Sequence, residues 1–244
     1  MVQPCSAVII GVGPQQGLGA ALAGYFSGKG LHVFIAGRSE DKLQRVAGHI
    51  RQQGGSVTVV VADATLEQDV ARLFGVVQQQ GYSVDIAAYN VDSNRPSPLL
   101  ATDTETFTAL WRQNCLGAFL FGKAAVNAMQ DRHQGSLFFT GATASLRAKP
   151  PFTAFAAAKA GLRALAQGMA REFGPQGIHV VHAVIDGVID GDRARQQFPD
   201  YVKAKGSDGL LQLDAIAQTY WALHQQHPSA WTHELDLRPF KETF

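Results

Sequence analysis

A lysine and an aromatic residue lie one helical turn apart in the segment FTAFAAAKAGLRAL, residues 152–165. Apolar residues recur here at helical spacing, which places Phe155 and Lys159 on one face of a predicted helix. An ammonium group beside a phenol lowers the pKa of the phenol and so helps it to exchange a proton. Phe155 has no hydroxyl, so the pair resembles a proton-transfer site in which the phenol of a tyrosine is missing.

A glycine-rich loop, GVGPQQGLG at residues 11–19, lies between a predicted strand and a predicted helix. In this context glycines allow a tight turn, a close approach of a pyrophosphate and close packing of the helix. The unpaired N–H groups at the start of the helix then face the phosphates. Glycine spacing alone could also mark a simple turn, so the strand–loop–helix order is what favours a dinucleotide site. The residues expected to hold the pyrophosphate are Gly13, Gln16, Gly17, Leu18 and Gly19.

The second and third predicted strands end in residues that would select the cofactor. NAD sites usually carry an acidic residue after the second strand, where it holds the ribose 2′-hydroxyl. This chain has Arg38 there, and a guanidinium can pair with a 2′-phosphate. NADP(H) is therefore preferred and NAD(H) is the second choice, unless Arg38 is only a surface residue beside a helix cap at Ser39. After the third strand, Asp63 and Ala64 are expected near the adenine, although Asp63 could equally cap the next helix.

Short apolar runs alternate with helical patterns along the whole chain. Strands that are apolar on both faces and joined by helices indicate a parallel sheet covered on both sides. Right-handed crossovers then give a doubly wound Rossmann fold, which we predict as one α/β domain over residues 1–244 with a mainly parallel seven-stranded sheet. The predicted strands are Ala7–Val12, His32–Ala36, Ser56–Ala62, Val84–Tyr89, Ser136–Thr140, Ile178–Ile185 and Glu234–Leu237, and the predicted helices are 17–29, 40–53, 66–80, 104–130, 152–173 and 213–226.

Composition and patterning argue against several classes of protein. The formal net charge of +1 does not suit a strongly basic nucleic-acid surface. The first apolar run ends in the glycine-rich loop, which is typical of a core strand rather than a signal peptide, and no apolar stretch approaches the roughly 20 residues of a membrane helix. Cys5 and Cys115 are expected to be buried free thiols of a cytoplasmic protein. The histidine spacing gives no pattern of metal ligands, so no metal is expected.

Two of the predicted helices carry broad apolar stripes that are rich in small residues. One stripe runs from Phe107 to Ala125 and the other from Ala158 to Phe173. Both are expected to contact the core. Because small residues let the helices of a second subunit approach closely, we also expect a homo-oligomer, either a dimer or a tetramer.

With these residues in place, the chain resembles the short-chain dehydrogenase/reductase family over nearly all of its length. The family's Thr-Gly-xxx-Gly-x-Gly loop corresponds to residues 12–19, with Val in place of Thr. Its Asn-Asn-Ala-Gly motif corresponds to residues 89–92, where only Asn90 matches. Its Pro-Gly segment, which lines the nicotinamide, corresponds to a segment that contains Gly187 and Ile189. The resemblance implies one Rossmann domain that binds NAD(P)(H) and acts on a small molecule.

The catalytic residues depart from the family's pattern. The family's Tyr-xxx-Lys corresponds to Phe155 and Lys159, and its catalytic serine corresponds to Ala142. In the family, hydride moves between the nicotinamide and a carbonyl carbon while Tyr supplies the proton and Ser holds the oxygen, so ketone reduction by this route should be very slow here. Lys159 either keeps the family's hydrogen bond to the nicotinamide ribose or directs its head to solvent. Asn114 corresponds to an asparagine that holds a water in a proton relay, but it could equally bond a backbone carbonyl.

Two functions remain open, and a third alternative is a purely structural module that binds no cofactor. The first is an NAD(P)(H)-dependent oxidoreductase with an atypical site that transfers hydride to a small organic substrate. Its proton would come from Tyr89 at the end of the fourth predicted strand, from water held by Lys159 and Asn114, or from the substrate. The second is a catalytically degenerate protein that binds dinucleotide as a sensor or as a structural or regulatory subunit. In either case, residues 190–213 are expected to cover the substrate, and residues 201–205 to form a mobile lid.

Overall fold

The seven strands form one sheet at the centre of the computed structural model, which describes residues 3–206 and 208–242. Residues 1–2, 207 and 243–244 of the predicted domain lie outside the described residues. The strand order is β3-β2-β1-β4-β5-β6-β7, and each pair of neighbours is parallel, which confirms the predicted doubly wound Rossmann sheet. The strands are β1 (Cys5–Ile10), β2 (His32–Gly37), β3 (Val57–Val61), β4 (Ser83–Tyr89), β5 (Gly135–Thr140), β6 (Ile178–Ile185) and β7 (Glu234–Leu237).

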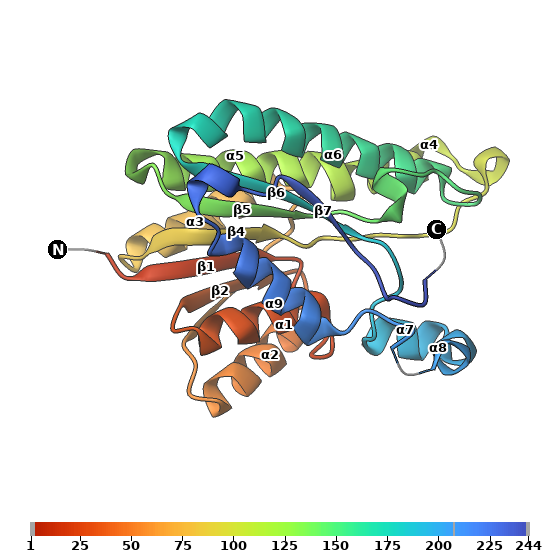
Figure 1. Cartoon of the computed structure of the whole chain (residues 1–244), viewed down its shortest axis with the longest axis horizontal. Coiled ribbons are helices and arrows are strands. Elements are labelled where there is room, and N and C mark those ends of the chain that lie inside the picture. The colour runs from red at the N-terminus through yellow and green to blue at the C-terminus, as the bar shows by residue number, and fades with distance from the viewer. Residues whose placement is uncertain (1–2, 207, 243–244) are drawn as a thin grey trace.

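Helices cover both faces of this sheet (Figure 1). One face packs against α1 (Leu18–Gly28), α2 (Glu40–Gln52) and α9 (Leu213–His224), and the other against α3 (Glu67–Gln79), α5 (Gly117–Met129) and α6 (Thr153–Phe173). The chain runs outward from β1 to β3 and then crosses to β4 and onward to β7. The loops after β1 and β4 therefore diverge, and in such sheets this switch point opens a crevice at the carboxyl ends of the strands.

The first strand ends earlier than the sequence predicts, at Ile10 instead of Val12. Gly11 begins the turn, with a φ of +91° that L-residues rarely adopt. A Cβ atom added to Gly11 would lie 2.5 Å from the carbonyl carbon of Asn90. The turn therefore needs glycine at this position, and it brings the loops after β1 and β4 into contact.

The prediction of one continuous α-helix over 104–130 is wrong, because the middle of this segment is not α-helical. The chain forms α4 (Thr104–Trp111), a π-helical segment η2 (Arg112–Leu116) and then α5. The apolar stripe of this region is also only partly in the core. Its residues Leu110, Ala118 and Ala125 are buried. Three of its large side chains are instead exposed by 40–45 %: Phe107, Trp111 and Phe119.

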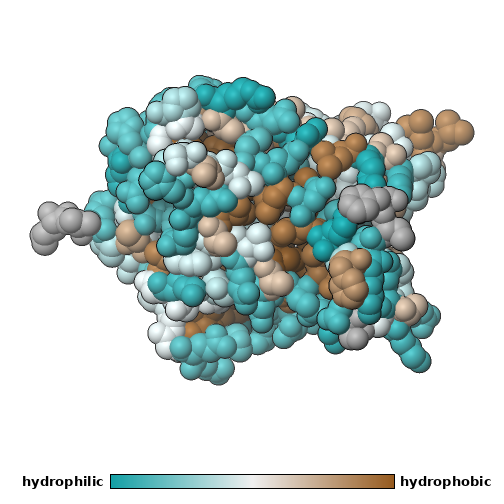
Figure 2. Space-filling model, viewed as in Figure 1, coloured by the Kyte–Doolittle hydropathy of each residue, from teal (hydrophilic) through white to brown (hydrophobic). Residues whose placement is uncertain are grey.

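The surface is mostly hydrophilic on the face shown in Figure 2, and hydrophobic residues gather mainly between α6 and α9. Among the described residues, no helix combines the length and the apolar character that crossing a membrane requires. Both cysteines are free, as predicted, but the expectation that both are buried is wrong. Cys5 is exposed because it is the first residue of β1, before the strand becomes buried, and Cys115 is half-buried.

A buried histidine that is hydrogen-bonded to a glutamate joins β6 and β7, and the same glutamate is paired with an arginine of α6. Glu234 accepts two hydrogen bonds from Arg163, at 2.6 and 2.7 Å, and lies 2.9 Å from Nδ1 of the buried His182. Burial lowers the pKa of His182 to about 4. The bonds from Arg163 lower the pKa of Glu234 to about 2.

These shifts predict a loss of stability in acid. The unfolded chain protonates His182 below pH 6.5 and the folded chain does so only near pH 4, so stability falls between these values. Glu234 continues the loss from pH 4.5 to about 2. The contribution of His182 is at most about 3 kcal/mol. Urea unfolding measured from pH 7 to pH 4 should show a shallower decline for His182→Gln than for the parent protein, and equal declines would contradict the assignment.

Candidate active site

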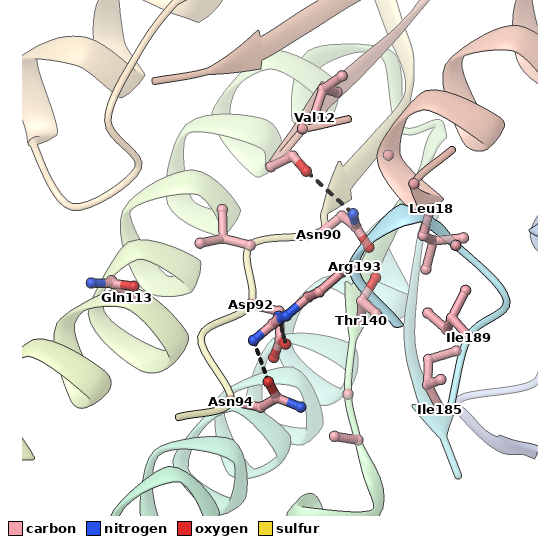
Figure 3. A pocket seen from close by; sticks show the side chains of 18 of the residues that line it. Val12, Leu18, Asn90, Asp92, Asn94, Gln113, Thr140, Ile185, Ile189 and Arg193 are labelled. Atoms are coloured by element: carbon pink, nitrogen blue, oxygen red, sulfur yellow. Dashed lines mark hydrogen bonds and ion pairs between the residues drawn. The ribbon is translucent and has the colours of Figure 1, made fainter. Parts of the chain in front are cut away.

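A cavity of about 700 Å³ opens at the carboxyl edge of the sheet, at the switch point between β1 and β4. The loops after β1 to β6 all contribute to its lining, part of which is drawn in Figure 3. The structure brings together here all the residues expected to hold the cofactor: Gly13, Gln16, Gly17, Leu18, Gly19, Arg38, Asp63, Ala64, Asn90, Lys159, Gly187 and Ile189. The roles of these residues remain predictions, but their shared location is that of a single elongated ligand.

The glycine-rich loop forms one wall of this cavity. The N-cap of α1 is Gly17, which offers no side chain to the first N–H groups of the helix, and the first turn holds no acidic residue. Asn90 donates a hydrogen bond from Nδ2 to the carbonyl of Gly11 at 3.4 Å, which ties the loops after β1 and β4 together (Figure 3). At Gly13 an added Cβ would meet no heavy atom within 4 Å, so its Cα faces open space. The loop thus presents a positively polarised helix end beside free volume, which suits a phosphate.

Two cations line the far end of the cavity, after β2. Arg38 is exposed there, as the sequence predicts, and Lys42 of α2 joins it. Sequence analysis missed Lys42, which lies in the first turn of α2, just after Arg38 in the chain. Asp63 also lines this end, where its Oδ1 accepts hydrogen bonds from the N–H and the hydroxyl of Thr65, each at 2.8 Å. Asp63 therefore stabilises a turn and does not cap α3, whose N-cap is Leu66.

Lys159 of α6 lines the cavity. Its side chain is only 1 % exposed, which excludes the alternative that its head reaches solvent. Nζ donates to the carbonyl of Thr140 at 3.0 Å and lies 5.7 Å from the centroid of the Phe155 ring. Phe155 and Ala142 both line the cavity beside it. The amine is thus held rigidly, next to two side chains that have no hydroxyl.

The partner of this amine is a carboxylate that sequence analysis did not identify. Asp92, in the loop after β4, lies with Oδ1 3.3 Å from Nζ of Lys159. Its Oδ2 accepts from Nη1 of Arg193, also at 3.3 Å, and Arg193 donates to Asn94 as well (Figure 3). The sequence shows only that Asp replaces the glycine of a family motif. No local pattern links it to Arg193, which is 101 residues away.

Tyr89 does not take part in the site, and the expectation that it supplies a proton is wrong. Its side chain is fully buried on the α5 side of β4, and its hydroxyl donates to the carbonyl of Gln113. Burial raises the pKa of this phenol. Tyr89 also does not line the cavity. It is therefore a core residue without access to a ligand.

Asn114 is buried in the π-helical segment and does not line the cavity either. Its Nδ2 donates to the carbonyl of Leu110 at 2.9 Å, which is the backbone bond that the sequence left open. Within the described part of the chain its Oδ1 has no hydrogen-bond partner. The structure thus shows the structural role, and a part in a water relay remains a prediction.

The segment that the sequence places over the substrate forms two short helices, α7 (Asp192–Gln197) and α8 (Pro199–Lys205). The first turn of α7 is attached to the glycine-rich loop. Asp192 donates its N–H to the carbonyl of Gln16 at 2.8 Å, and its carboxylate accepts from the N–H of Gln16 at 3.2 Å. Together with the bonds of Arg193, these contacts fasten α7 to the loops after β1 and β4 that line the cavity.

A second acidic residue, Asp186, organises the opposite wall. It is buried after β6, and it accepts hydrogen bonds from the Thr143 hydroxyl at 2.5 Å, from Arg147 at 3.0 and 3.2 Å, and from Arg238. Thr143 and Arg147 line the cavity, whereas Asp186 itself does not. Asp186 therefore positions the loop after β5.

Comparisons with known proteins agree with this geometry. The family model described as short chain dehydrogenase matches residues 7–201. A short-chain dehydrogenase from Rhodopseudomonas palustris, solved as a crystal structure, is 34 % identical, with a TM-score of 0.83 over 97 % of this chain and 99 % of that one. A short-chain dehydrogenase/reductase of Hericium erinaceus is 31 % identical over 176 residues, which are 70 % of each protein. The actinorhodin polyketide ketoreductase, solved with NADPH, shares the fold with a TM-score of 0.86 at 18 % identity, over 97 % of this chain and 96 % of its own. The cavity, the sheet order and these similarities together show that the chain belongs to the short-chain dehydrogenase family.

Proposed function

We propose that the protein is an NADP(H)-dependent oxidoreductase with an atypical active site, which transfers hydride between the cofactor and a small organic substrate. The observation that carries the proposal is that the glycine-rich loop, Arg38 and the buried Lys159 all line one cavity. A bound nicotinamide would supply the hydride chemistry. The chain itself supplies the binding and orienting groups.

The choice of NADP(H) is supported by the cations at the adenine end. Arg38 and Lys42 both line the cavity there, and a guanidinium matches the geometry of a phosphate. The actinorhodin ketoreductase was solved with NADPH, so a cavity in this fold can hold that cofactor. NAD(H) would leave both cations without a phosphate partner, which makes it the second choice.

Replacing Arg38 by Ala should weaken NADP+ binding and leave NAD+ binding nearly unchanged. Loss of a charge-assisted hydrogen bond predicts an increase of about 10- to 100-fold in the Kd for NADP+. Isothermal titration calorimetry with both nucleotides measures this. Arg45→Ala is the matched control, because Arg45 is an exposed arginine of the adjoining helix α2 that does not line the cavity. Equal losses for both nucleotides, or equal effects of both variants, would contradict the assignment of Arg38.

The reacting end of the cavity supports an altered chemistry. Lys159 is positioned to donate to the nicotinamide ribose from its remaining N–H bonds, while Phe155 and Ala142 form an apolar wall. In this family those two positions hold the hydroxyls that give the proton and bind the reacting oxygen. Because each such group contributes about 10²–10⁴ in rate, a substrate that needs both hydroxyls would react slowly here.

Turnover tests the proposal directly. Oxidation of NADPH and reduction of NADP+ should be followed by absorbance with a panel of ketones, enones, imines and secondary alcohols, after calorimetry has established cofactor binding. Steady turnover with at least one class is expected. Binding without turnover of any class would favour the alternative, a dinucleotide-binding sensor or regulatory subunit. Absence of binding to either nucleotide would remove both functions.

We also propose that the protein forms a homo-oligomer through α4 and α5. Phe107 and Trp111 of α4 and Phe119 of α5 are each exposed by at least 40 %. Large apolar side chains grouped on neighbouring helices are typical of surfaces that a partner covers.

A further inference from the structure

We propose that Asp92 is the catalytic acid–base group of this site, and that it takes over the proton transfer that Phe155 cannot perform. The substrate would then be an alcohol whose hydroxyl gives its proton to Asp92 while the adjacent carbon gives its hydride to the cofactor. This inference rests on the proposed function, because it needs the dinucleotide as the hydride acceptor.

The geometry places an oxygen acid–base group beside the surviving lysine. Lys159 is fixed by the carbonyl of Thr140 at 3.0 Å, and its ammonium group lies 3.3 Å from Oδ1 of Asp92. A carboxylate that lies within reach of a bound substrate can act as a general acid or base. Here that oxygen comes from the loop after β4 rather than from α6.

The carboxylate is oriented from two sides and remains accessible. Oδ1 faces Lys159, Oδ2 faces Arg193 of the covering segment, and the side chain is still 36 % exposed in the cavity. A carboxylate has about four lone-pair positions, so two cations leave room for a substrate hydroxyl. Arg193 is bonded to Asn94 as well, which fixes the guanidinium that holds Asp92. The covering segment and the carboxylate are therefore positioned as a unit.

The other candidate groups are engaged elsewhere. Among the described residues that line the cavity, the carboxylates are Asp63 and Asp92, and Asp63 lies at the adenine end in a turn with Thr65. The hydroxyl of Thr143 is bonded to Asp186. The side chain of Tyr89 is buried in the core between β4 and α5, and its hydroxyl is bonded to the carbonyl of Gln113. Asp92 is thus the carboxylate of the described chain that lies at the reacting end.

The reaction balances when Asp92 accepts the proton and a bound NADP+ accepts the hydride. The O–H bond of the alcohol breaks, and its proton goes to a carboxylate oxygen of Asp92. The neighbouring C–H bond breaks and its hydride, with two electrons, goes to C4 of the nicotinamide of NADP+, while the carbon–oxygen double bond forms. The products are a carbonyl compound, NADPH and a protonated Asp92, which then releases its proton to solvent. In the reverse direction the protonated carboxyl returns the proton to the carbonyl oxygen.

Chemical rescue tests this role in the full-length protein. NADP+ reduction should be measured with a panel of secondary alcohols for the parent protein, for Asp92→Asn and for Asp92→Gly, together with the Kd for NADP+. Both variants should lose about 10²–10⁴ in kcat and should bind NADP+ within about twofold of the parent protein. Added formate should restore the rate of Asp92→Gly at least about tenfold, because the vacated volume admits a small carboxylate, and formamide should not.

A matched control separates this effect from the general loss of an ion pair. Asp85→Asn removes a carboxylate that is paired with Arg132 at 2.6 Å, and neither residue lines the cavity. Asp85→Asn should leave kcat unchanged.

The remaining outcomes overturn the inference in distinguishable ways. Unchanged kcat in Asp92→Asn would reject the acid–base role and leave the proposed function intact. Loss of NADP+ binding in both variants, or activity that formate does not restore, would make Asp92 a positioning residue for Lys159. Absence of alcohol oxidation by the parent protein, despite NADP+ binding, would reject the inference, and the ketone, enone and imine assays would then decide the proposed function separately.

Discussion

The double variant Phe155→Tyr with Ala142→Ser is expected to reduce simple ketones with NADPH at least about 10²-fold faster than the parent protein. Phe155 lines the cavity with its ring centroid 5.7 Å from Nζ of Lys159, so an added phenol would enter the cavity near an ammonium group that favours its ionised form. Ala142 lines the same wall, where a serine hydroxyl could hold the carbonyl oxygen. Initial rates with cyclic and aryl ketones at saturating NADPH measure the gain.

Each single variant should gain much less than the pair, because the proton donor and the group that binds the oxygen act as a unit. Phe152→Tyr is the matched control, since Phe152 also lines the cavity but is not in the position of the family's tyrosine. It should give no gain. If the double variant folds, binds NADPH and still shows no ketone reduction, then the loop after β4 with Asp92 is incompatible with the family's usual chemistry.

The parts of the fold that sequence analysis predicted correctly are those with a local physical signature. Apolar runs of strand length between helical patterns gave all seven strands to within about two residues, because buried parallel strands must be apolar on both faces. The glycine-rich loop was recognised from its glycine spacing between a strand and a helix, and the structure shows that Gly11 closely approaches the backbone of Asn90. The predicted strands and the glycine-rich loop were enough to predict which residues line the proposed cofactor end of the cavity, because the strand order determines which loops lie together.

The errors occur where the decisive contact is not local. Every residue of β4 is buried, so the hydropathy pattern of the strand does not show on which face of the sheet the side chain of Tyr89 lies. The structure places this side chain against α5. The break in the helix over 104–130 carries no proline, and its apolar spacing continues through the π-helical segment. The pairing of Asp92 with Lys159 and Arg193 joins three distant segments of the chain. A motif comparison therefore reports only a missing glycine at position 92, while the folded chain shows a carboxylate that lines the cavity and pairs with Lys159.

The variant Gly13→Val is expected to remove cofactor binding without unfolding the protein. An added Cβ at Gly13 would meet no heavy atom within 4 Å, and the residue has no positive φ. The substitution should therefore change the free energy of unfolding by no more than about 0.5 kcal/mol. The new side chain would nevertheless stand in the cavity beside the start of α1, where the pyrophosphate is proposed to approach the backbone. We expect the Kd for NADP+ to rise by about 100-fold or more, which corresponds to roughly 2.7 kcal/mol.

Two further glycines make this result specific. Gly24→Val places a side chain in open space on α1 but outside the cavity, and it should affect neither folding nor binding. Gly19→Val should instead destabilise the fold, because its Cβ would lie 2.9 Å from the carbonyl oxygen of Gly11 and 3.0 Å from Cα of Val12. Urea unfolding and calorimetry on the three variants separate the two effects. Tight NADP+ binding by a folded Gly13→Val protein would mean that the dinucleotide does not pass over this loop, and the proposed orientation of the cofactor would have to be abandoned.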